Sequence, residues 1–202
     1  RIRFISGTGG WKIPASAWEW RVRERSEGRP FPTFDHGPHL WASAWFLLGD
    51  IEKISSWIDS RDGMIDCPAL VQWKYRGAAT YGTCDYSHAP SMNVPSKYYA
   101  NDEGFEITGE KGIIMVRRCT GNINPGPAVS VFNGKKWKSY NPVSDWGAGF
   151  IGSTKNFIAA IRGREEPLLS GAQAYEILKI DFAVQRSSRL RRAVYLAEME
   201  RA

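Results

Sequence analysis

Long hydrophobic runs are missing from this 202-residue sequence. A membrane-spanning helix needs about 18 to 20 mostly apolar residues, and the longest candidate, Leu40 to Leu48, is already interrupted by Ser43. No membrane partner is therefore expected. The sequence also lacks the basic start, apolar stretch and cleavage site of a signal peptide. Because it begins at Arg1 and enters a strand-like run at once, we expect it to be the later part of something longer.

Cysteine is scarce, and the basic residues are not gathered into a patch. Cys67, Cys84 and Cys119 are far apart, with no CxxC pair and no Asn-x-Ser/Thr acceptor, which predicts a cytoplasmic protein. The net charge of +6 could indicate a nucleic-acid partner. However, basic residues cluster only where a solvated helix end is expected, and no nucleic acid is predicted. That cluster contains Arg186, Arg189, Arg191 and Arg192.

The overall composition is that of a soluble globular protein. Hydrophobic residues make up 43% and charged residues 24% of the chain, which excludes disorder, collagen and coiled coil. Aromatic residues reach 13%, with nine tryptophans. Tryptophan combines flat apolar area with a polar N–H, so this richness suits sugar-stacking or interface surfaces, and equally a Trp-rich core.

Hydropathy periodicity predicts helices at both ends of a long run of strands. Apolar residues at helical spacing predict a buried helix from His39 to Leu48, ended by Gly49. Two more helices are predicted near the C-terminus, the first ending at Gly163 and the second opening with the capping-box spelling Ser170 to Gln173. The second has apolar residues at i+4 steps: Ala174, Leu178 and Phe182. The predicted strands are Arg1–Ser6, Ile51–Ile58, Ala69–Tyr75, Ala79–Tyr86, Glu103–Gly109, Ile113–Arg117, Val129–Phe132, Lys136–Tyr140 and Ala193–Leu196.

This order of elements predicts an α+β fold. We expect one large, mostly antiparallel sheet with helices packed on one face, because short connections such as Arg76-Gly77 and Asn133-Gly134 predict hairpins. Runs such as Leu70–Trp73 and Ile113–Val116 read as apolar on both faces of a strand. The open face is therefore expected to pair with another subunit, giving a homo-oligomer.

The densest chemistry lies immediately before the first predicted helix, at Asp35, His36 and His39. If Pro38 lies in the first helical turn, Asp35 and His39 can point into one pocket. An imidazole can take and return a hydroxyl proton near neutral pH, and a carboxylate can fix its tautomer. This pairing predicts acid/base catalysis by Asp35 and His39.

Two other interpretations of this stretch stay open from the residues alone. The three side chains could ligate a metal, but they fall short of a closed four-ligand site, and no metal is predicted. Alternatively, Asp35 caps the helix and His39 is a hydrogen-bonded core residue.

The order of features resembles a known family. Phe34-Asp35-x-Gly37-x-His39, an apolar helix ending in Leu47-Leu48-Gly49, and Ile51 to Ile54 follow one another, as do Glu106–Ile114, Phe157–Gly163, Ser170-Gly171 and Val194–Leu196. This series is similar to the C-terminal domain of the Gfo/Idh/MocA oxidoreductases, which are related to glucose-fructose oxidoreductase and inositol dehydrogenase. The resemblance covers nearly the whole chain.

The resemblance implies a two-domain enzyme in which an N-terminal Rossmann domain binds NAD or NADP. Residues 1–202 would be a single C-terminal substrate-binding and oligomerisation domain, with the Rossmann domain absent from this chain. In the family, the Asp and His of the D-x-G-x-H stretch assist proton transfer from an alcohol, which gives Asp35 and His39 their roles. Family members often have Asp three residues after that His, where this chain has Ala42. The expected substrate-binding residues are Trp11, Trp18, Trp20, Arg23 and His36.

The predicted function is therefore that of one domain of a two-domain enzyme. Gly7-Thr8-Gly9-Gly10 precedes no βαβ unit, so no dinucleotide fingerprint is supported. We expect the substrate-binding and acid/base domain of an NAD(P)-dependent dehydrogenase oxidising a hydroxyl of a sugar, cyclitol or related polyol, inactive without the nucleotide-binding domain. The alternative is a non-catalytic domain that binds carbohydrate or assembles subunits.

Overall fold

The structure of this protein is a computed structural model. The residues that it describes are 1–9, 19–20, 23, 26–27, 33, 36–60, 66–89, 101–117, 126–143 and 146–201. Across these ranges, no helix is both long enough and apolar enough to cross a membrane.

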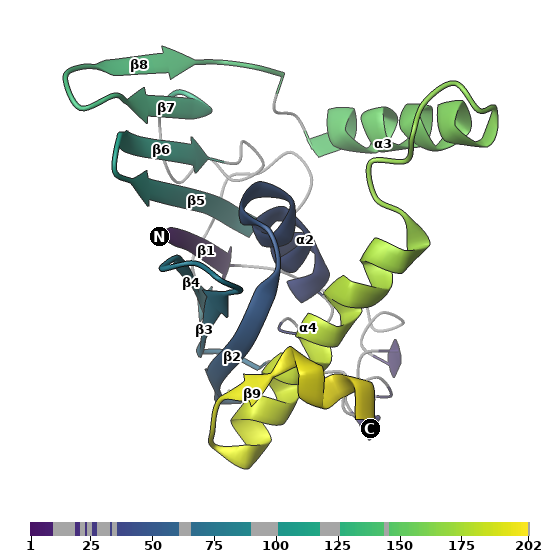
Figure 1. The fold of residues 1–202 in the computed structure, drawn as a ribbon. Coiled ribbons are helices and arrows are strands. Elements are labelled where there is room, and N and C mark those ends of the chain that lie inside the picture. The colour runs from purple at the N-terminus through teal and green to yellow at the C-terminus, as the bar shows by residue number, and fades with distance from the viewer. Residues whose placement is uncertain are drawn as a thin grey trace.

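A nine-stranded sheet forms one layer of the molecule, with strand order β8-β7-β6-β5-β1-β4-β3-β2-β9 (Figure 1). All neighbouring pairs are antiparallel except β1 and β4. The predicted hairpins β3–β4, β5–β6 and β7–β8 are confirmed, and the last strand pairs with β2 at the sheet edge. The bounds are β1 Ile2–Gly9, β2 Ile51–Ile58, β3 Ala69–Tyr75, β4 Tyr81–Ala89, β5 Asn101–Gly109, β6 Gly112–Arg117, β7 Val129–Phe132, β8 Trp137–Tyr140 and β9 Val194–Tyr195.

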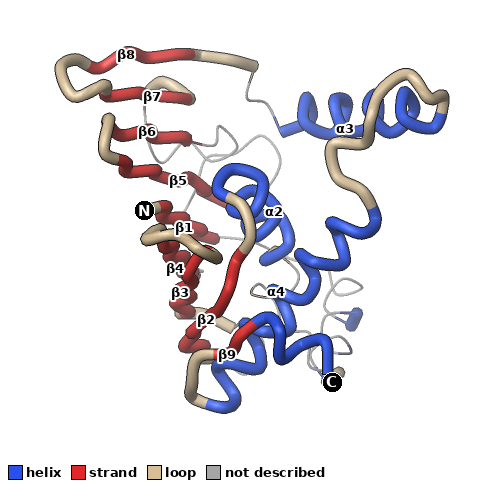
Figure 2. Tube along the Cα trace, viewed as in Figure 1, coloured by secondary structure: helices blue, strands red, loops and turns tan. Residues whose placement is uncertain are grey.

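Helices α2 (Gly37–Leu48) and α4 (Gly171–Leu190) lie on the same face of this sheet (Figure 2). The core forms between them and the inward side chains of β1 to β4, because alternate residues of a strand point to one face. Tyr75 in β3 donates a hydrogen bond from its hydroxyl to the carbonyl of Ala44 in α2, at 3.2 Å. Fully buried core residues include Ile2, Trp41, Ile54, Val71, Ile180 and Val184. The α+β class predicted from the sequence is confirmed.

Helix α4 presents a different face to the core from the one marked by the i+4 apolar spacing. Its capping box is formed as spelled: Gln173 N donates to Ser170 Oγ, and Ser170 N donates to Gln173 Oε1. Leu178 and Phe182, however, are 39% and 40% exposed. The buried residues of α4 are Ile177, Lys179, Ile180, Asp181, Ala183, Val184, Gln185 and Ser187. Since α4 is apolar on more than one side, spacing alone did not select its buried stripe.

Helix α3 (Trp146–Ile161) stands apart from the sheet, at the upper right of Figure 1. The helix predicted before Gly163 is confirmed, but the side chains of its apolar residues Phe150, Phe157 and Ile161 are 56%, 65% and 70% exposed. Of the three long helices that the described ranges contain, α2 and α4 therefore pack on the sheet and α3 does not.

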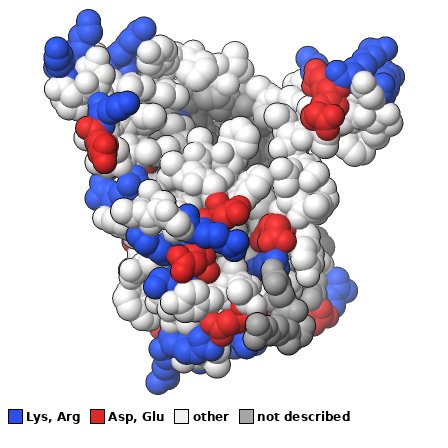
Figure 3. Space-filling model, viewed as in Figure 1, with Lys and Arg blue, Asp and Glu red and all other residues white. Residues whose placement is uncertain are grey.

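The outer face of the sheet carries a mixture of side chains. Register places Lys53, Gln72, Thr83 and Glu106 on this face, with the exposed aromatic ring of Trp57. The expectation that β3 is apolar on both faces is therefore wrong, because its outward residues include Gln72 and Lys74 beside Leu70. Figure 3 shows the molecule from the side seen in Figure 1, where basic and acidic side chains are interspersed and do not form one continuous patch.

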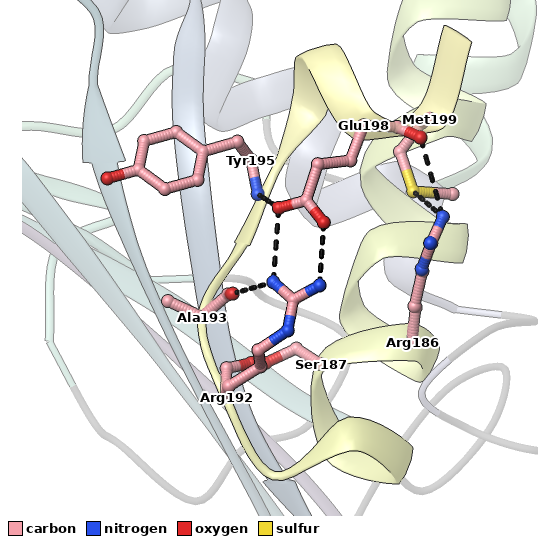
Figure 4. Close-up of polar contacts among 7 residues, drawn as sticks. All are labelled: Arg186, Ser187, Arg192, Ala193, Tyr195, Glu198 and Met199. Atoms are coloured by element: carbon pink, nitrogen blue, oxygen red, sulfur yellow. Dashed lines mark hydrogen bonds and ion pairs between the residues drawn. The ribbon is translucent and has the colours of Figure 1, made fainter. Parts of the chain in front are cut away.

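The C-terminal segment is tied to the end of α4 by one ion pair (Figure 4). Both guanidinium nitrogens of Arg192 donate to the carboxylate of Glu198, at 3.1 and 2.7 Å. Glu198 lies in the short 3-10 helix Leu196–Arg201 and also accepts from Tyr195 N at 2.9 Å. Arg186 Nη1 donates to the Glu198 carbonyl at 3.4 Å. Two arginines of the basic cluster that was expected to be solvated, Arg186 and Arg192, thus donate hydrogen bonds to Glu198, in the segment that follows β9.

Candidate active site at the start of helix α2

Helix α2 begins at the stretch that the sequence singled out. His36 is its N-cap residue, and Pro38 lies in the first turn as predicted. Asp35, Trp11 and Trp18 lie outside the described residues. One turn further along α2, Trp41 is fully buried in the hydrophobic core. The segment before α2 is held at Thr33, whose buried hydroxyl accepts from Gln185 Nε2 of α4 at 2.9 Å.

His39 is exposed, in the first turn of α2. The interpretation of His39 as a buried core histidine is therefore wrong. The N-cap residue is His36, whose side chain makes no capping hydrogen bond, and Asp35, the cap in the alternative interpretation, lies outside the described residues. An exposed imidazole beside a fixed helix start is a group that can meet a ligand and exchange a proton with it.

His36 sits beside His39 and faces the sheet. The two ring centroids are 5.3 Å apart and the planes meet at 62°, an edge contact. His36 Nε2 is 2.9 Å from Glu103 Oε1 of β5, and the two side chains are only 15% and 8% exposed. The expected substrate-binding residue thus has one ring nitrogen engaged by a buried carboxylate, and the structure brings His36, His39 and Glu103 together.

A second carboxylate lies directly under the start of α2. Asp181 of α4 is fully buried, and its Oδ1 accepts from Trp41 Nε1 at 2.5 Å. A Cβ atom added to Gly37 would overlap both of these atoms. The glycine of the D-x-G-x-H stretch is therefore required by close packing of α2 on α4. The helix has no acidic residue in its own first turn, so Asp181 supplies negative charge near its positive end.

Buried groups next to these carboxylates stay neutral at physiological pH. Burial, followed by the neighbouring Cys84, Asp181 and Glu103, raises the pKa of Tyr86 well above its usual value. Burial, followed by Asp85, likewise raises the pKa of Cys84. Burial and then Asp66 raise the pKa of Cys67 to about 12. Both thiols are therefore protonated at physiological pH, and neither acts as a nucleophile there.

The remaining predicted site residues that the structure describes are Trp20 and Arg23. Both have helical backbone and exposed side chains, Trp20 at 41%. The ring contact and hydrogen bond that join His36, His39 and Glu103 involve neither of them. Within the described ranges, no group of three or more His, Cys, Asp or Glu side chains could hold a metal ion.

The described residues do not fit a dinucleotide. Gly7 and Gly9 belong to β1, which is paired with β4 on one side and with β5 on the other. A phosphate-binding glycine loop instead leaves its strand and opens a helix, whose N-terminus faces the phosphates. These glycines are therefore part of a central strand, and no step involving a nicotinamide is assigned to them.

Sequence reasoning missed Glu103 and Asp181. Glu103 shares the helix-facing side of β5 with Phe105 and Ile107, so a charge on an otherwise apolar strand face was the available signal. Asp181 similarly interrupts the buried stripe of α4. Both lie far from Asp35 and His39 along the chain, and only the fold brings their elements to the start of α2.

The fold and the site together define an α+β sheet domain with two neighbouring histidines at the start of a helix. The sequence of residues 4–196 matches the family described as "Oxidoreductase family, C-terminal alpha/beta domain". The chain therefore belongs to the Gfo/Idh/MocA oxidoreductases, as the resemblance predicted. A comparison with curated protein sequences finds no match.

Solved structures confirm the fold at low sequence identity. Levoglucosan dehydrogenase in complex with NADH and L-sorbose is 17% identical, with a TM-score of 0.73 over 99% of this chain and 60% of its own. An Agrobacterium radiobacter oxidoreductase in complex with NAD+, L-tartaric acid and magnesium is 14% identical, with a TM-score of 0.72 over 98% of this chain and 57% of its own. The Caulobacter crescentus aldose-aldose oxidoreductase complexed with glycerol is 16% identical, with a TM-score of 0.70, over 96% and 55% respectively. The chain thus spans a little over half of each protein.

Proposed function

We propose that this domain binds the substrate and supplies the acid/base group of an NAD(P)-dependent dehydrogenase oxidising a hydroxyl of a sugar, cyclitol or related polyol. The observation that carries the proposal is the exposed position of His39 in the first turn of α2, within the family's D-x-G-x-H stretch. The structural neighbours in complex with NADH and L-sorbose, or with glycerol, support the substrate class.

In the proposed reaction His39 accepts the proton of the substrate hydroxyl, and Asp35 orients and charges the site. A neutral imidazole has one unprotonated nitrogen available for this purpose. Trp11, Trp18, Trp20 and Arg23 are proposed to wall the pocket, with flat rings for the sugar face and a guanidinium for its hydroxyls.

The nicotinamide cofactor, NAD or NADP, is proposed to bind mainly to a separate N-terminal Rossmann domain. The described residues of this chain do not fit the cofactor, and the chain spans 55% to 60% of the three dehydrogenase-related structures compared above. Residues 1–202 are then one domain whose turnover depends on the partner domain. The 202-residue chain alone is expected to show no polyol-dependent NAD(P) reduction.

The test is an assay of polyol-dependent NAD(P) reduction with the protein expressed from its complete reading frame. His39→Ala should lower kcat by about 10²–10⁴-fold, the usual contribution of general acid–base catalysis. Arg76→Ala, in the exposed β3–β4 turn, is the control and should keep wild-type turnover. Unchanged turnover in His39→Ala would remove His39 from the mechanism.

A non-catalytic role in carbohydrate binding or subunit assembly is the second candidate. It is favoured by Ala42, which packs partly buried against the core where family members often carry Asp. This role predicts saturable polyol binding by calorimetry with no reduction of either nicotinamide cofactor. Turnover that depends on His39 would reject it.

A further inference from the structure

The pair formed by Glu103 and His36 lies beside the proposed proton acceptor and is unused by the proposed mechanism. Glu103 is on the helix-facing side of β5, opposite Ser6 of β1, and Tyr86 lies opposite Ser6 on the other flank. An almost fully buried carboxylate is costly unless it is hydrogen-bonded. The contact of 2.9 Å with His36 Nε2 provides that hydrogen bond.

This contact fixes the tautomer of His36. A carboxylate can only accept hydrogen bonds, so His36 Nε2 carries the donated proton whether the ring is neutral or cationic. In the neutral ring, Nδ1 is then unprotonated. The ring is also fixed in direction, because β5 is a paired sheet strand and the N-cap backbone of α2 is held by the helix.

The ring of His36 contacts the ring of His39. The two residues are i and i+3 at the start of one helix, so their side chains meet on the same side. Their rings form an edge contact with centroids 5.3 Å apart. This contact restricts the rotamers open to the His39 ring, and a catalytic base must be held close to its productive geometry.

We propose that Glu103 is a positioning residue, which fixes the His36 ring by its hydrogen bond and thereby sets the orientation of the His39 imidazole. His36 is assigned here to the support of His39 in place of the substrate-binding role expected from the sequence. The consequence for turnover rests on the proposed function, whereas the effect on the His39 ring does not.

The test distinguishes the length of the side chain at position 103, here called its reach, from its charge. Glu103→Gln keeps the length of the side chain and an accepting oxygen but removes the charge. Glu103→Asp keeps the charge but shortens the side chain by one methylene, so it cannot maintain the 2.9 Å contact without movement of the backbone. Glu106→Gln and Glu106→Asp are matched controls, since Glu106 is on the same strand but faces the other side.

The first measurement is histidine-selective ¹⁵N NMR of the protein expressed from its complete reading frame, with signals assigned by His36→Gln and His39→Gln. In the wild type and Glu103→Gln, His36 should be held as the Nε2-protonated tautomer. In Glu103→Asp, both the His36 and the His39 ring signals should shift and average. The Glu106 variants should move neither. Unchanged His39 signals in Glu103→Asp would overturn the proposal, whatever the activity.

The second measurement is steady-state kinetics on the same proteins. Glu103→Asp should lower kcat by about 10–100-fold with KM little changed, the size expected for misplacing a catalytic group. Glu103→Gln should keep most of the wild-type kcat. A loss confined to Glu103→Gln would overturn the proposal, because the charge and not the reach of the side chain would then matter. Equal losses in both variants would overturn it too, because an accepting oxygen at full reach would then not be sufficient. If Glu103→Asp does not fold, Glu103→Ala replaces it with the same expectations.

The two measurements test the proposed function and the positioning role independently. A wild-type protein without polyol-dependent turnover refutes the proposed function, and the NMR comparison still decides whether Glu103 orients His39. If the wild type shows normal turnover and the His39 signals are the same in the wild type and in Glu103→Asp, the positioning role is refuted and the proposed function is not.

Discussion

At the scale of single residues, stability near the C-terminus depends on ionised Glu198. Hydrogen bonds from Arg192, and then from the Tyr195 backbone, lower the pKa of Glu198 to about 2. A carboxylate with a lowered folded-state pKa stabilises the fold above its unfolded pKa of about 4.5, and this contribution is lost as the pH falls toward 2. The ion pair with Arg192 therefore acts at neutral pH and disappears in acid.

The corresponding prediction compares Glu198→Gln with the wild type in urea unfolding between pH 7 and pH 2. The variant should be less stable at pH 7, and the difference between the two midpoints should shrink below about pH 4.5 and vanish near pH 2. Glu110→Gln, in the exposed β5–β6 turn, is the control, and the difference between its unfolding midpoint and that of the wild type should not shrink as the pH falls. A difference that persists at pH 2 would mean that the carboxyl acts without its charge.

At the scale of elements, the packing of α2 on α4 depends on the missing side chain of Gly37. A methyl group there would overlap Asp181 Oδ1 and Trp41 Nε1, which are joined by a buried hydrogen bond. Gly37→Ala should therefore lower the free energy of unfolding by about 1–3 kcal/mol, the usual cost of overpacking. Urea unfolding followed by tryptophan fluorescence measures this change.

Gly152→Ala is the matched control for that substitution. Gly152 lies within helix α3, and a Cβ atom added there meets no heavy atom within 4 Å. Alanine favours a helix over glycine by about 0.5–1 kcal/mol, so this variant should be neutral or slightly stabilised. If both glycine variants lost the same stability, the overlap with Asp181 and Trp41 would not be the cause.

The same elements show what could be predicted from the sequence and what could not. Strand β3 was predicted with its observed bounds, Ala69–Tyr75, because its neighbours are clear turn residues. The buried stripe of α4 was not, because Ile177 and Leu178 are equally apolar and only packing selects one of them. Within the site, the local Asp35 to His39 stretch could be read directly, whereas Glu103 required the pairing of β5 with β1.

At the scale of the whole molecule, the outer face of the sheet is the surface proposed to bind a second copy of the chain. Nine strands at a spacing of about 4.8 Å extend for roughly 40 Å, and strands about 20 Å long give a face of roughly 800 Å². That area matches what each partner of a stable interface buries. Trp57 and Trp137, 62% and 50% exposed, lie on this face, and tryptophan is enriched where interfaces are strongest.

The prediction is that Trp57→Arg weakens a homo-oligomer formed by the protein expressed from its complete reading frame. Placing an unpaired charge within an interface typically raises Kd by at least tenfold, because the guanidinium must lose its water. Light scattering on a size-exclusion column should show a lower mass at micromolar concentration. Phe157→Arg on α3, with a similarly exposed ring, is the control. Dissociation by Phe157→Arg with no effect of Trp57→Arg would move the interface from the sheet to α3.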